Sequence, residues 1–199
     1  MKVLFITLGV IIGALVIWGI FYLVGQSINN NIIVKDEAVK AKWGGVQSQY
    51  QRRSDLIPNL VATVKGVANF EKSTLVEVTD ARARATSIQV DPTKLNPETI
   101  QKYQAAQGQL STALGRLLVA SENYPDLKAN QNFSDLQAEL EGTENRISVA
   151  RMDFNAAVQD YNITIRSFPA SIVASSHGYT VKGSFGAEAA AQNAPKVSF

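Results

Sequence analysis

The chain of 199 residues contains no cysteine and only one histidine, His177. The missing thiols exclude cysteine catalysis, disulfides and an anchor attached through a lipid-modified cysteine. Zinc sites need several closely spaced donors, and a lone histidine in a polar C-terminal stretch is typical of a solvated residue. We therefore expect no metal and no other cofactor.

Short catalytic motifs are missing as well. The sequence has no Walker A loop, no G-x-G-x-x-G after a strand, no G-x-S-x-G elbow and no H-E-x-x-H pair. Glu139, Glu141 and Glu144 could suggest a carboxylate metal site, but ferritin-like sites also need Glu-x-x-His on two helices, which this sequence lacks. These absences predict a protein that is not an enzyme.

An excess of one charge is also absent. The chain has 19 Lys and Arg against 17 Asp and Glu, with a formal net charge of +2, and the two signs are interspersed along the sequence. Nucleic-acid-binding proteins usually carry a basic block or stripe. The charge pattern predicts no nucleic-acid partner.

One long apolar run lies at the start of the chain. From Val3 to Gly25 the only polar residue is Thr7, and a helix of that length rises about 34 Å, enough to cross the hydrocarbon core of a bilayer. A cleaved secretory signal would have a shorter apolar core and an Ala-x-Ala site after it, which the sequence does not show. Residues 1–25 are therefore predicted to be a retained, single-pass transmembrane anchor.

Two features of the anchor bear on its surroundings. Gly9 and Gly13 form a G-x-x-x-G pair, a pattern that lets two membrane helices pack closely. The lysines after the anchor favour a cytoplasmic body, whereas a short basic N-terminus before a long apolar segment is typical of a signal-anchor that translocates the rest of the chain. We take the extracytoplasmic side as the working prediction.

After the anchor, residues 26–33 are predicted to be a polar linker and residues 34–170 a bundle of long helices. Apolar residues recur at helical spacing in three segments: residue 34 to about 85, residue 97 to about 124, and about 130 to 168. Pro58 is expected to kink the first segment, which counts as one helix or two, and Asn96 is expected to cap the second. The pattern predicts an all-α, antiparallel bundle of three to four long helices.

The last part of the chain has a different composition. Residues 171–199 are rich in alanine, glycine and serine and carry few apolar side chains. Chain ends of this kind are commonly mobile. We expect a mobile tail, with packing of the tail against the bundle as the alternative.

Several charged residues lie on or beside the apolar faces of the predicted helices: Arg53, Asp55, Glu71, Glu144 and Arg151. A charge inside a bundle must be paired, because an unpaired buried charge strongly destabilises the fold. Under one hypothesis, an arginine of this set pairs with Glu71 or Glu144 across the bundle. Such a pair would fix the register of the helices.

A second hypothesis makes part of the first helix a docking surface. Arg52, Arg53 and Asp55 lie close together in the sequence, and Pro58 and Asn59 lie shortly after them. A bent helix that carries these charges could bind a partner protein. Helical spacing alone does not separate this role from helix register.

Three stretches of the sequence are distinctive. They are residues 51–66, which begin QRRSDLIPNLV and end VKG; residues 140–169, which begin LEGTENRI and include the pairs FN, YN and FP; and residues 194–199, APKVSF. Together they resemble the LemA family. The resemblance implies a bacterial membrane protein with a short N-terminus, one membrane span and a bundle of long helices, and it supplies no catalytic residues.

The family resemblance also bears on function. Its members include a magnetosome-associated relative, which hints at membrane organisation. We expect a non-enzymatic scaffold or adaptor in the bacterial inner membrane, with the lipid bilayer, other membrane or envelope proteins and further copies of the chain as partners. The alternative is a self-assembling protein that remodels the bilayer or forms a pore.

Overall fold

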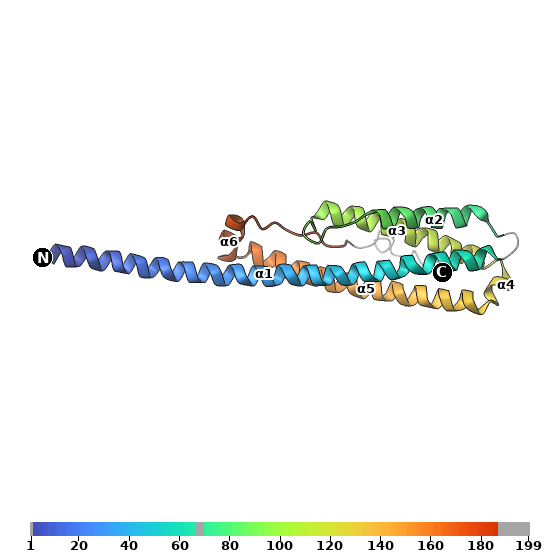
Figure 1. Cartoon of the computed structure of the whole chain (residues 1–199), viewed down its shortest axis with the longest axis horizontal. Helices are drawn as coiled ribbons and strands as arrows, with labels where there is room; N and C mark the ends of the chain where they lie inside the picture. Colours follow the sequence, from blue (N-terminus) through green and yellow to red (C-terminus); the bar gives the residue numbers. More distant parts are fainter. Residues whose placement is uncertain (1, 67–69, 187–199) are drawn as a thin grey trace, which may run out of the picture.

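The computed structural model describes residues 2–66 and 70–186, and all regular secondary structure in these residues is helical. The helices are α1 (Lys2–Lys65), α2 (Lys72–Ser87), α3 (Pro97–Ser121), α4 (Pro125–Lys128), α5 (Gln131–Arg166) and α6 (Ala170–His177). Figure 1 shows a rod in which α1, α2, α3 and α5 run side by side, while the first part of α1 extends alone beyond them. The predicted all-α bundle is confirmed.

Helix α1 joins the predicted anchor to the bundle without a break. The expected polar linker at residues 26–33 is therefore wrong. Ile28 and Ile32 lie four residues apart on one face of the helix and pack in the core that begins at this level. Because this packing outweighs the modest helix propensity of the neighbouring asparagines, the helix continues through them.

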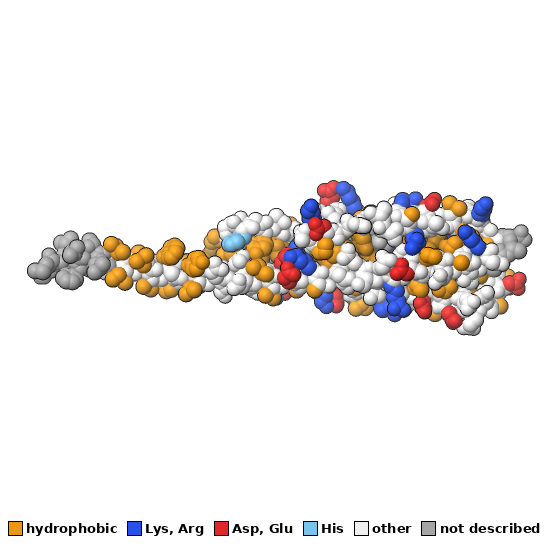
Figure 2. Space-filling view, in the orientation of Figure 1, with side chains coloured by type: hydrophobic (Ala, Val, Ile, Leu, Met, Phe, Trp, Pro, Cys, Tyr) orange, Lys and Arg blue, Asp and Glu red, His pale blue; other side chains and the backbone are white. Residues whose placement is uncertain are grey.

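The apolar run lies outside the bundle. Its large side chains are exposed from Ile11 to Val24, and Phe21 is 74% exposed. This part of α1 is long and apolar enough to cross a membrane. Figure 2 shows hydrophobic side chains along the visible face of the protruding helix. Exposure of a continuous apolar surface of this length to water is unfavourable. Such a surface is typical of a helix that faces lipid.

The first predicted helical segment forms two helices. Helix α1 passes through Pro58 without a loop, ends at Lys65 and is followed by α2 from Lys72. The apolar spacing had continued across this break. The helix breaks here because of tertiary packing. Leu75 of α2 belongs to the same buried cluster as Leu60 of α1, and this contact requires the chain to reverse direction between them.

Asparagine caps set the starts of the next two long helices. Asn96 accepts a hydrogen bond from the backbone N–H of Thr99 at 2.8 Å, and Pro97 occupies the first position of α3. Asn130 accepts one from the N–H of Phe133 at 3.3 Å at the start of α5. The predicted cap at Asn96 is confirmed.

The core consists of two apolar clusters along the rod. The proximal cluster, nearer the protruding part of α1, is built around Trp43, whose ring centre lies 5.2 Å from that of Tyr103 and 5.3 Å from that of Phe154. Along α1, the proximal cluster ends at Tyr50 and the distal cluster begins at Ile57. The segment between these two residues carries the three charged candidate residues of α1, which are Arg52, Arg53 and Asp55.

Part of the expected mobile tail packs against the bundle. Helix α6 buries Ala174 in the proximal cluster and is capped after His177 by Gly178, whose φ of 74° is a left-handed conformation that suits glycine. Residues 178–186, which we call the strap, then run along the bundle without regular secondary structure and bury Phe185. Residues 171–186 thus adopt the alternative considered from the sequence, packing against the bundle, and residues 187–199 lie outside the described part of the chain.

Candidate functional site

A buried arginine lies between the two core clusters. Arg53 is 1% exposed, and its guanidinium donates hydrogen bonds to Glu144 Oε2 at 2.9 Å and to Ser111 Oγ at 2.7 Å. It also donates to Gln107 Oε1 at 2.7 Å, and its Cζ lies 5.0 Å from the ring centre of Tyr50. These groups come from α1, α3 and α5. We call them the Arg53 layer, because they tie three helices together at one level of the rod.

The chemistry of the Arg53 layer is that of a fixed ion pair. The Glu144 side chain is 50% exposed and the Arg53 side chain only 2%, so the anion reaches water while the cation stays inside. A guanidinium does not release its proton at accessible pH, so Arg53 cannot serve as a base. Burial raises the pKa of the nearby Tyr103, which keeps its phenol neutral. Among the described residues, no group of three or more acidic or histidine side chains could hold a metal ion.

Four residues of the predicted docking surface are exposed on α1: Arg52, Asp55, Pro58 and Asn59. Arg52 and Asp55 line an open groove of about 740 Å³ that Glu139 of α5 borders on the other side. Arg53 does not belong to this groove, because its side chain is buried in the bundle. The structure therefore separates two roles that the sequence had placed on adjacent arginines.

Pro58 leaves one carbonyl of α1 without its helical donor. In a regular helix the N–H of residue 58 would bond to the carbonyl of Ser54, and proline has no N–H. Arg82 of α2 takes this place, since its Nε donates to the Ser54 carbonyl at 2.8 Å. The proline thus creates the acceptor through which α2 is attached to α1.

We expect Arg82→Ala to lower the free energy of unfolding by about 1–2 kcal/mol, because the Ser54 carbonyl loses its donor. In a chain that also carries Pro58→Ala, the restored N–H supplies that donor and the effect of Arg82→Ala should shrink. A double-mutant cycle, measured by denaturation of the full chain in detergent, gives the difference. Arg84→Ala, at an exposed position of the same helix, is the control. Equal effects of Arg82→Ala in both backgrounds would contradict this account.

Side-chain amides hold the strap through both their donor and acceptor groups. Asn162 of α5 pairs with the backbone of Lys182, donating to its carbonyl and accepting from its N–H, both at 2.9 Å. Asn155 pairs in the same way with the backbone of Phe185, at 2.9 and 2.8 Å. Each amide makes the pair of backbone hydrogen bonds that a residue of a neighbouring β-strand would make. We call each such amide a rung.

The spacing of these rungs explains why the fit works. Asn155 and Asn162 are seven residues apart, which is about 10.5 Å along a helix, and three nearly extended strap residues cover about 10 Å. Gln104 of α3 adds a third rung by pairing with the backbone of Gly186 at 3.1 and 3.0 Å. In the sequence, Asn155 and Asn162 stand out only as part of a family resemblance. Their contact with the strap gives them a structural role.

A glycine lets the strap pass close to the start of α3. The N–H of Gly183 donates to the carbonyl of Leu95 at 2.8 Å. A Cβ at this position would lie 2.6 Å from the Cα of Pro97, a distance that backbone atoms cannot relieve by rotating a side chain. Any other residue here would push the strap away from the bundle.

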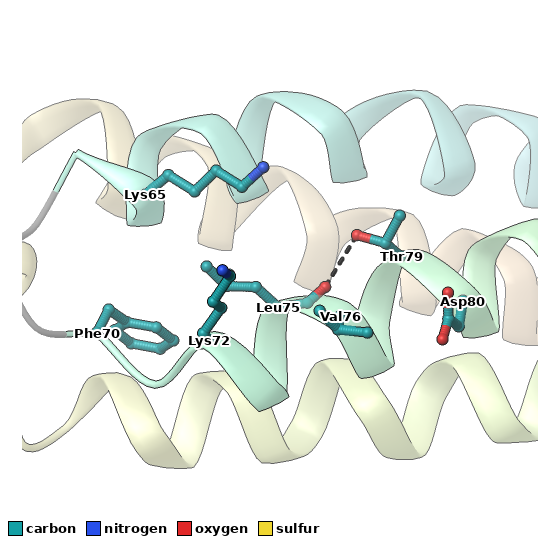
Figure 3. A pocket seen from close by; sticks show the side chains of 7 residues that line it. All are labelled: Lys65, Phe70, Lys72, Leu75, Val76, Thr79 and Asp80. Atoms are coloured by element: carbon teal, nitrogen blue, oxygen red, sulfur yellow. Dashed lines mark hydrogen bonds between the residues drawn. The ribbon is translucent and has the colours of Figure 1, made fainter.

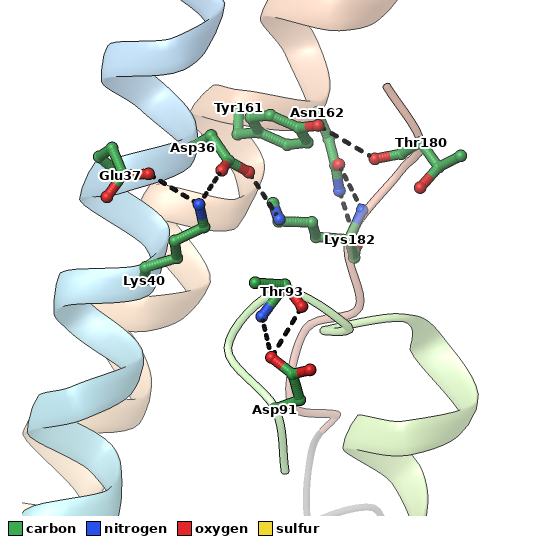
Figure 4. A network of polar contacts seen from close by, with 9 residues as sticks. All are labelled: Asp36, Glu37, Lys40, Asp91, Thr93, Tyr161, Asn162, Thr180 and Lys182. Carbon is green, nitrogen blue, oxygen red and sulfur yellow. Dashed lines mark hydrogen bonds and ion pairs between the residues drawn. The ribbon is translucent and has the colours of Figure 1, made fainter. Parts of the chain in front are cut away.

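An ion pair also fixes the strap to α1. Lys182 binds Asp36 at 2.7 Å, and Lys40 binds the same carboxylate at 2.7 Å (Figure 4). The Nζ of Lys182 lies 5.0 Å from the ring centre of Tyr161. Partial burial raises the pKa of Asp36, but the hydrogen bonds from Lys182 and Lys40 outweigh it, so the pKa lies below its ordinary value.

This pair predicts a pH dependence. Because the pKa of Asp36 is lower in the folded than in the unfolded chain, the pair contributes stability above about pH 4, and this contribution is lost as the pH falls through the folded-state pKa. We expect Asp36→Asn to remove part of the acid sensitivity of unfolding, measured as the loss of melting temperature between pH 7 and pH 3. Asp153→Asn, which removes an exposed pair with Lys42, is the control. Identical acid sensitivity of wild type and Asp36→Asn would refute the prediction.

The other charged candidates make different contacts. Arg151 donates to the carbonyl of Gly186 at 3.1 Å, and its Cζ lies 4.9 Å from the ring centre of Phe185, so it holds the end of the strap. Glu71 is exposed at the start of α2 and accepts a hydrogen bond from Thr74. Of the cross-bundle pairs expected from the sequence, the structure contains that of Arg53 with Glu144, and its role in register stays a prediction.

A cavity of about 490 Å³ opens near the end of the rod farthest from the protruding helix. Figure 3 shows Phe70, Leu75 and Val76 lining it, with Lys65 and Lys72 beside them. The lining joins the end of α1 to the start of α2. The apolar spacing had assigned these residues to one continuous segment, so the sequence did not predict the cavity.

The glycines of the anchor are open on the surface of α1. Gly9 and Gly13 are exposed, and a Cβ at either position would meet nothing within 4 Å. A second helix therefore has space to approach this face closely. Packing of two anchors through these glycines stays a prediction.

These features define a class of protein: an all-helical chain whose first helix carries an exposed apolar run and then forms one side of a closed bundle. The sequence matches the LemA family over residues 42–199, and the chain belongs to that family. It is a membrane-associated member, in agreement with the resemblance of its three distinctive stretches.

Named relatives extend the comparison. The chain is 26% identical to Protein LemA of Metamycoplasma hominis, with 78% of this chain and 68% of the relative covered. It is 28% identical to Magnetosome protein MamQ 2 of Paramagnetospirillum magneticum and 26% identical to Magnetosome protein MamQ of Magnetospirillum gryphiswaldense. In both of these, 75% of this chain is covered, and the chain spans 61% of the relative's length.

Proposed function

We propose that this protein is a non-enzymatic scaffold or adaptor of the bacterial inner membrane, and that its bundle binds other membrane or envelope proteins. The observation that carries the proposal is the continuity of α1, which is both the apolar anchor and the longest helix of the bundle. A flexible linker would let the body move freely over the membrane, whereas a helix acts as a stiff spacer. Stiff attachment is what holding a partner at a set position requires.

The length of α1 sets the heights at which partners can bind. From Gln26 to Lys65 the helix rises about 60 Å, and Arg52 lies about 40 Å above Gln26. The groove at Arg52 and Asp55 and the cavity between α1 and α2 are thus at different distances from the bilayer. Relatives named as magnetosome proteins support a role in organising a membrane structure.

Crosslinking in native membranes tests the scaffold proposal. A photoreactive residue at position 48, which lines the groove beside Arg52 without replacing it, or at position 76, followed by mass spectrometry, should give reproducible adducts with another membrane or envelope protein. Position 149, exposed on α5, serves as a comparison face. A chain that stays monomeric and yields no reproducible adduct from any position would count against the proposal.

The body of the protein is proposed to lie on the extracytoplasmic side. Because the chain has no cysteine, a single Val119→Cys variant carries one reactive thiol at an exposed site of α3. A membrane-impermeant maleimide should label it in intact spheroplasts. Labelling only after the cells are lysed would place the body in the cytoplasm instead.

The second candidate function is self-assembly on the bilayer, leading to remodelling or a pore. It draws on the open face at Gly9 and Gly13, which gives copies a way to meet within the membrane. Full-length protein reconstituted into liposomes should then cause leakage or a change of curvature, and replacement of both glycines by isoleucine should reduce it. Inert vesicles would remove the support for this alternative.

A further inference from the structure

Two ion pairs define how α5 is aligned with α1. Lys35 binds Asp160 at 2.6 Å, and Lys42 binds Asp153 at 2.7 Å. Seven residues forward along α1, from Lys35 to Lys42, correspond to seven residues backward along α5, from Asp160 to Asp153. The two helices are therefore antiparallel, and the residues of each pair lie at the same height along the rod. Continuing this alignment by six residues from the first pair brings Arg166, the last residue of α5, level with Asn29.

This level lies just outside the apolar run. The run ends at Gly25, and Asn29 is four residues, or about 6 Å, beyond it. The polar headgroup layer of a bilayer extends about 5–7 Å beyond the hydrocarbon core on each side. If α1 crosses the membrane through its apolar run, the turn from α5 to α6 lies in the headgroup layer.

The side chains at this turn are unusually apolar for an exposed corner. Phe168 is 82% exposed and Ile172, in the first turn of α6, is 63% exposed. Arg166 is exposed shortly before them. Figure 2 shows hydrophobic side chains continuing from the protruding helix onto this end of the bundle. This combination of side chains is typical of the membrane–water interface. There, aromatic and aliphatic side chains contact lipid and arginine side chains contact phosphate groups.

Contacts with α1 hold the corner at this height. Ala174 of α6 is buried in the proximal cluster, and Ile28 and Val173 pack against that cluster as well. The hydroxyl of Tyr179 donates to Asn29 Oδ1 at 3.1 Å. Because α6 is fixed to the segment of α1 that leaves the membrane, its exposed residues cannot move away from the bilayer independently.

We infer that the corner between α5 and α6 is a second membrane contact, in which Phe168 and Ile172 enter the bilayer interface and Arg166 meets phospholipid headgroups. The inference rests on the proposed anchoring by α1 and adds a surface of the bundle to it. The contact would stop the rod from tilting about its single span. It assigns α6 a purpose beyond closing the proximal core.

Single-cysteine variants of the full-length chain test the contact. Phe168→Cys and Ile172→Cys are labelled with an environment-sensitive fluorophore, and the protein is reconstituted into vesicles of phosphatidylcholine and phosphatidylglycerol. Phe21→Cys in the apolar run and Val119→Cys near the other end of the bundle are the matched references, because both positions are also exposed. All variants also carry Trp18→Phe, so that tryptophan emission comes from Trp43 alone and verifies that each variant keeps the proximal core.

Brominated lipids then report which labels touch the bilayer. Labels at 168 and 172 should lose most of their emission, as the label at 21 does, while the label at 119 stays unquenched. Quenching at 21 with 168 and 172 behaving like 119 would overturn the second contact and leave the anchor intact. An unquenched label at 21 would overturn the anchor and the contact together.

Discussion

Replacing Arg53 by alanine is expected to lower the free energy of unfolding by about 4 kcal/mol. The truncation removes a large buried side chain and leaves a cavity between the two core clusters. It also takes the donors away from Gln107, which is itself buried, and from Ser111. Glu144 loses its partner at smaller cost, because half of its side chain already reaches water. The loss should therefore come mainly from packing and from unpaired acceptors on α3.

Arg52→Ala is the matched control for this variant. It removes the same chemical group one residue away, but from an exposed position, so its effect should stay within about 0.5 kcal/mol. Both are measured by urea denaturation of the full chain in detergent, in a Trp18→Phe background that leaves Trp43 as the single emitting tryptophan. If Arg53→Ala folds as stably as Arg52→Ala, the Arg53 layer does not fix the bundle. Loss of partner crosslinks in a folded Arg52→Ala protein would instead mark the exposed groove as a docking surface.

Phe185→Ala is expected to cost about 3 kcal/mol and to release the strap from the bundle. Phe185 is 5% exposed and lies among aromatic rings, 5.5 Å from Phe154 and 6.1 Å from Trp43 between ring centres. Its loss removes the buried aromatic contact of the strap and leaves the amide rungs and the partly buried Tyr179. Limited proteolysis should cut the variant within residues 178–186 faster than the wild type, while the helices stay protected.

Gly183→Ala provides an independent route to the same state. It removes no contact and instead places a methyl group against the backbone of Pro97. Val181→Ala, at a half-exposed strap position, is the control and should leave cleavage unchanged. If Phe185→Ala and Gly183→Ala resist protease as well as the control does, the strap is not held by the contacts described. Release by Phe185→Ala alone would show that the aromatic contact holds the strap, and release by Gly183→Ala alone would show that the close approach to Pro97 does.

The long helices of the bundle were predictable because their signals are local. Asn96 followed by proline, and Asn130 before an apolar repeat, place the starts of α3 and α5 within the sequence itself. The apolar run after residue 2 likewise identifies the exposed part of α1. Each of these features depends on residues only a few positions away in the sequence, so it can be predicted without knowledge of the fold.

Two boundaries were not predictable from local signals. Asn29 to Asn31 are typical of a linker, yet Ile28 and Ile32 join a core that also contains residues of α3, α5, α6 and the strap. The strap itself has a composition typical of a mobile end. It is held by Asn155, Asn162 and Gln104, whose partners lie 20 to 82 residues away in the chain.

In the candidate site, too, some contacts follow from local sequence signals and others depend on the fold. The charges near the apolar faces predicted that Arg53 needs a buried partner, and Glu144 was among the partners considered. That Arg82 compensates Pro58 was not predictable, because it depends on where α2 lies after the chain reverses. The distal cavity was missed for the same reason.

The unbroken course of α1 also fixes an angle. Gly13 and Trp43 are 30 residues apart on one helix, and at about 100° per residue they point about one third of a turn away from each other. Two copies that met through their anchor glycines would therefore present set sides of their bundles to one another. Inserting one residue near Gln26 would rotate each bundle by about 100° relative to its anchor. The number of α1 residues between the anchor glycines and the bundle would therefore set how two associated molecules are oriented relative to each other.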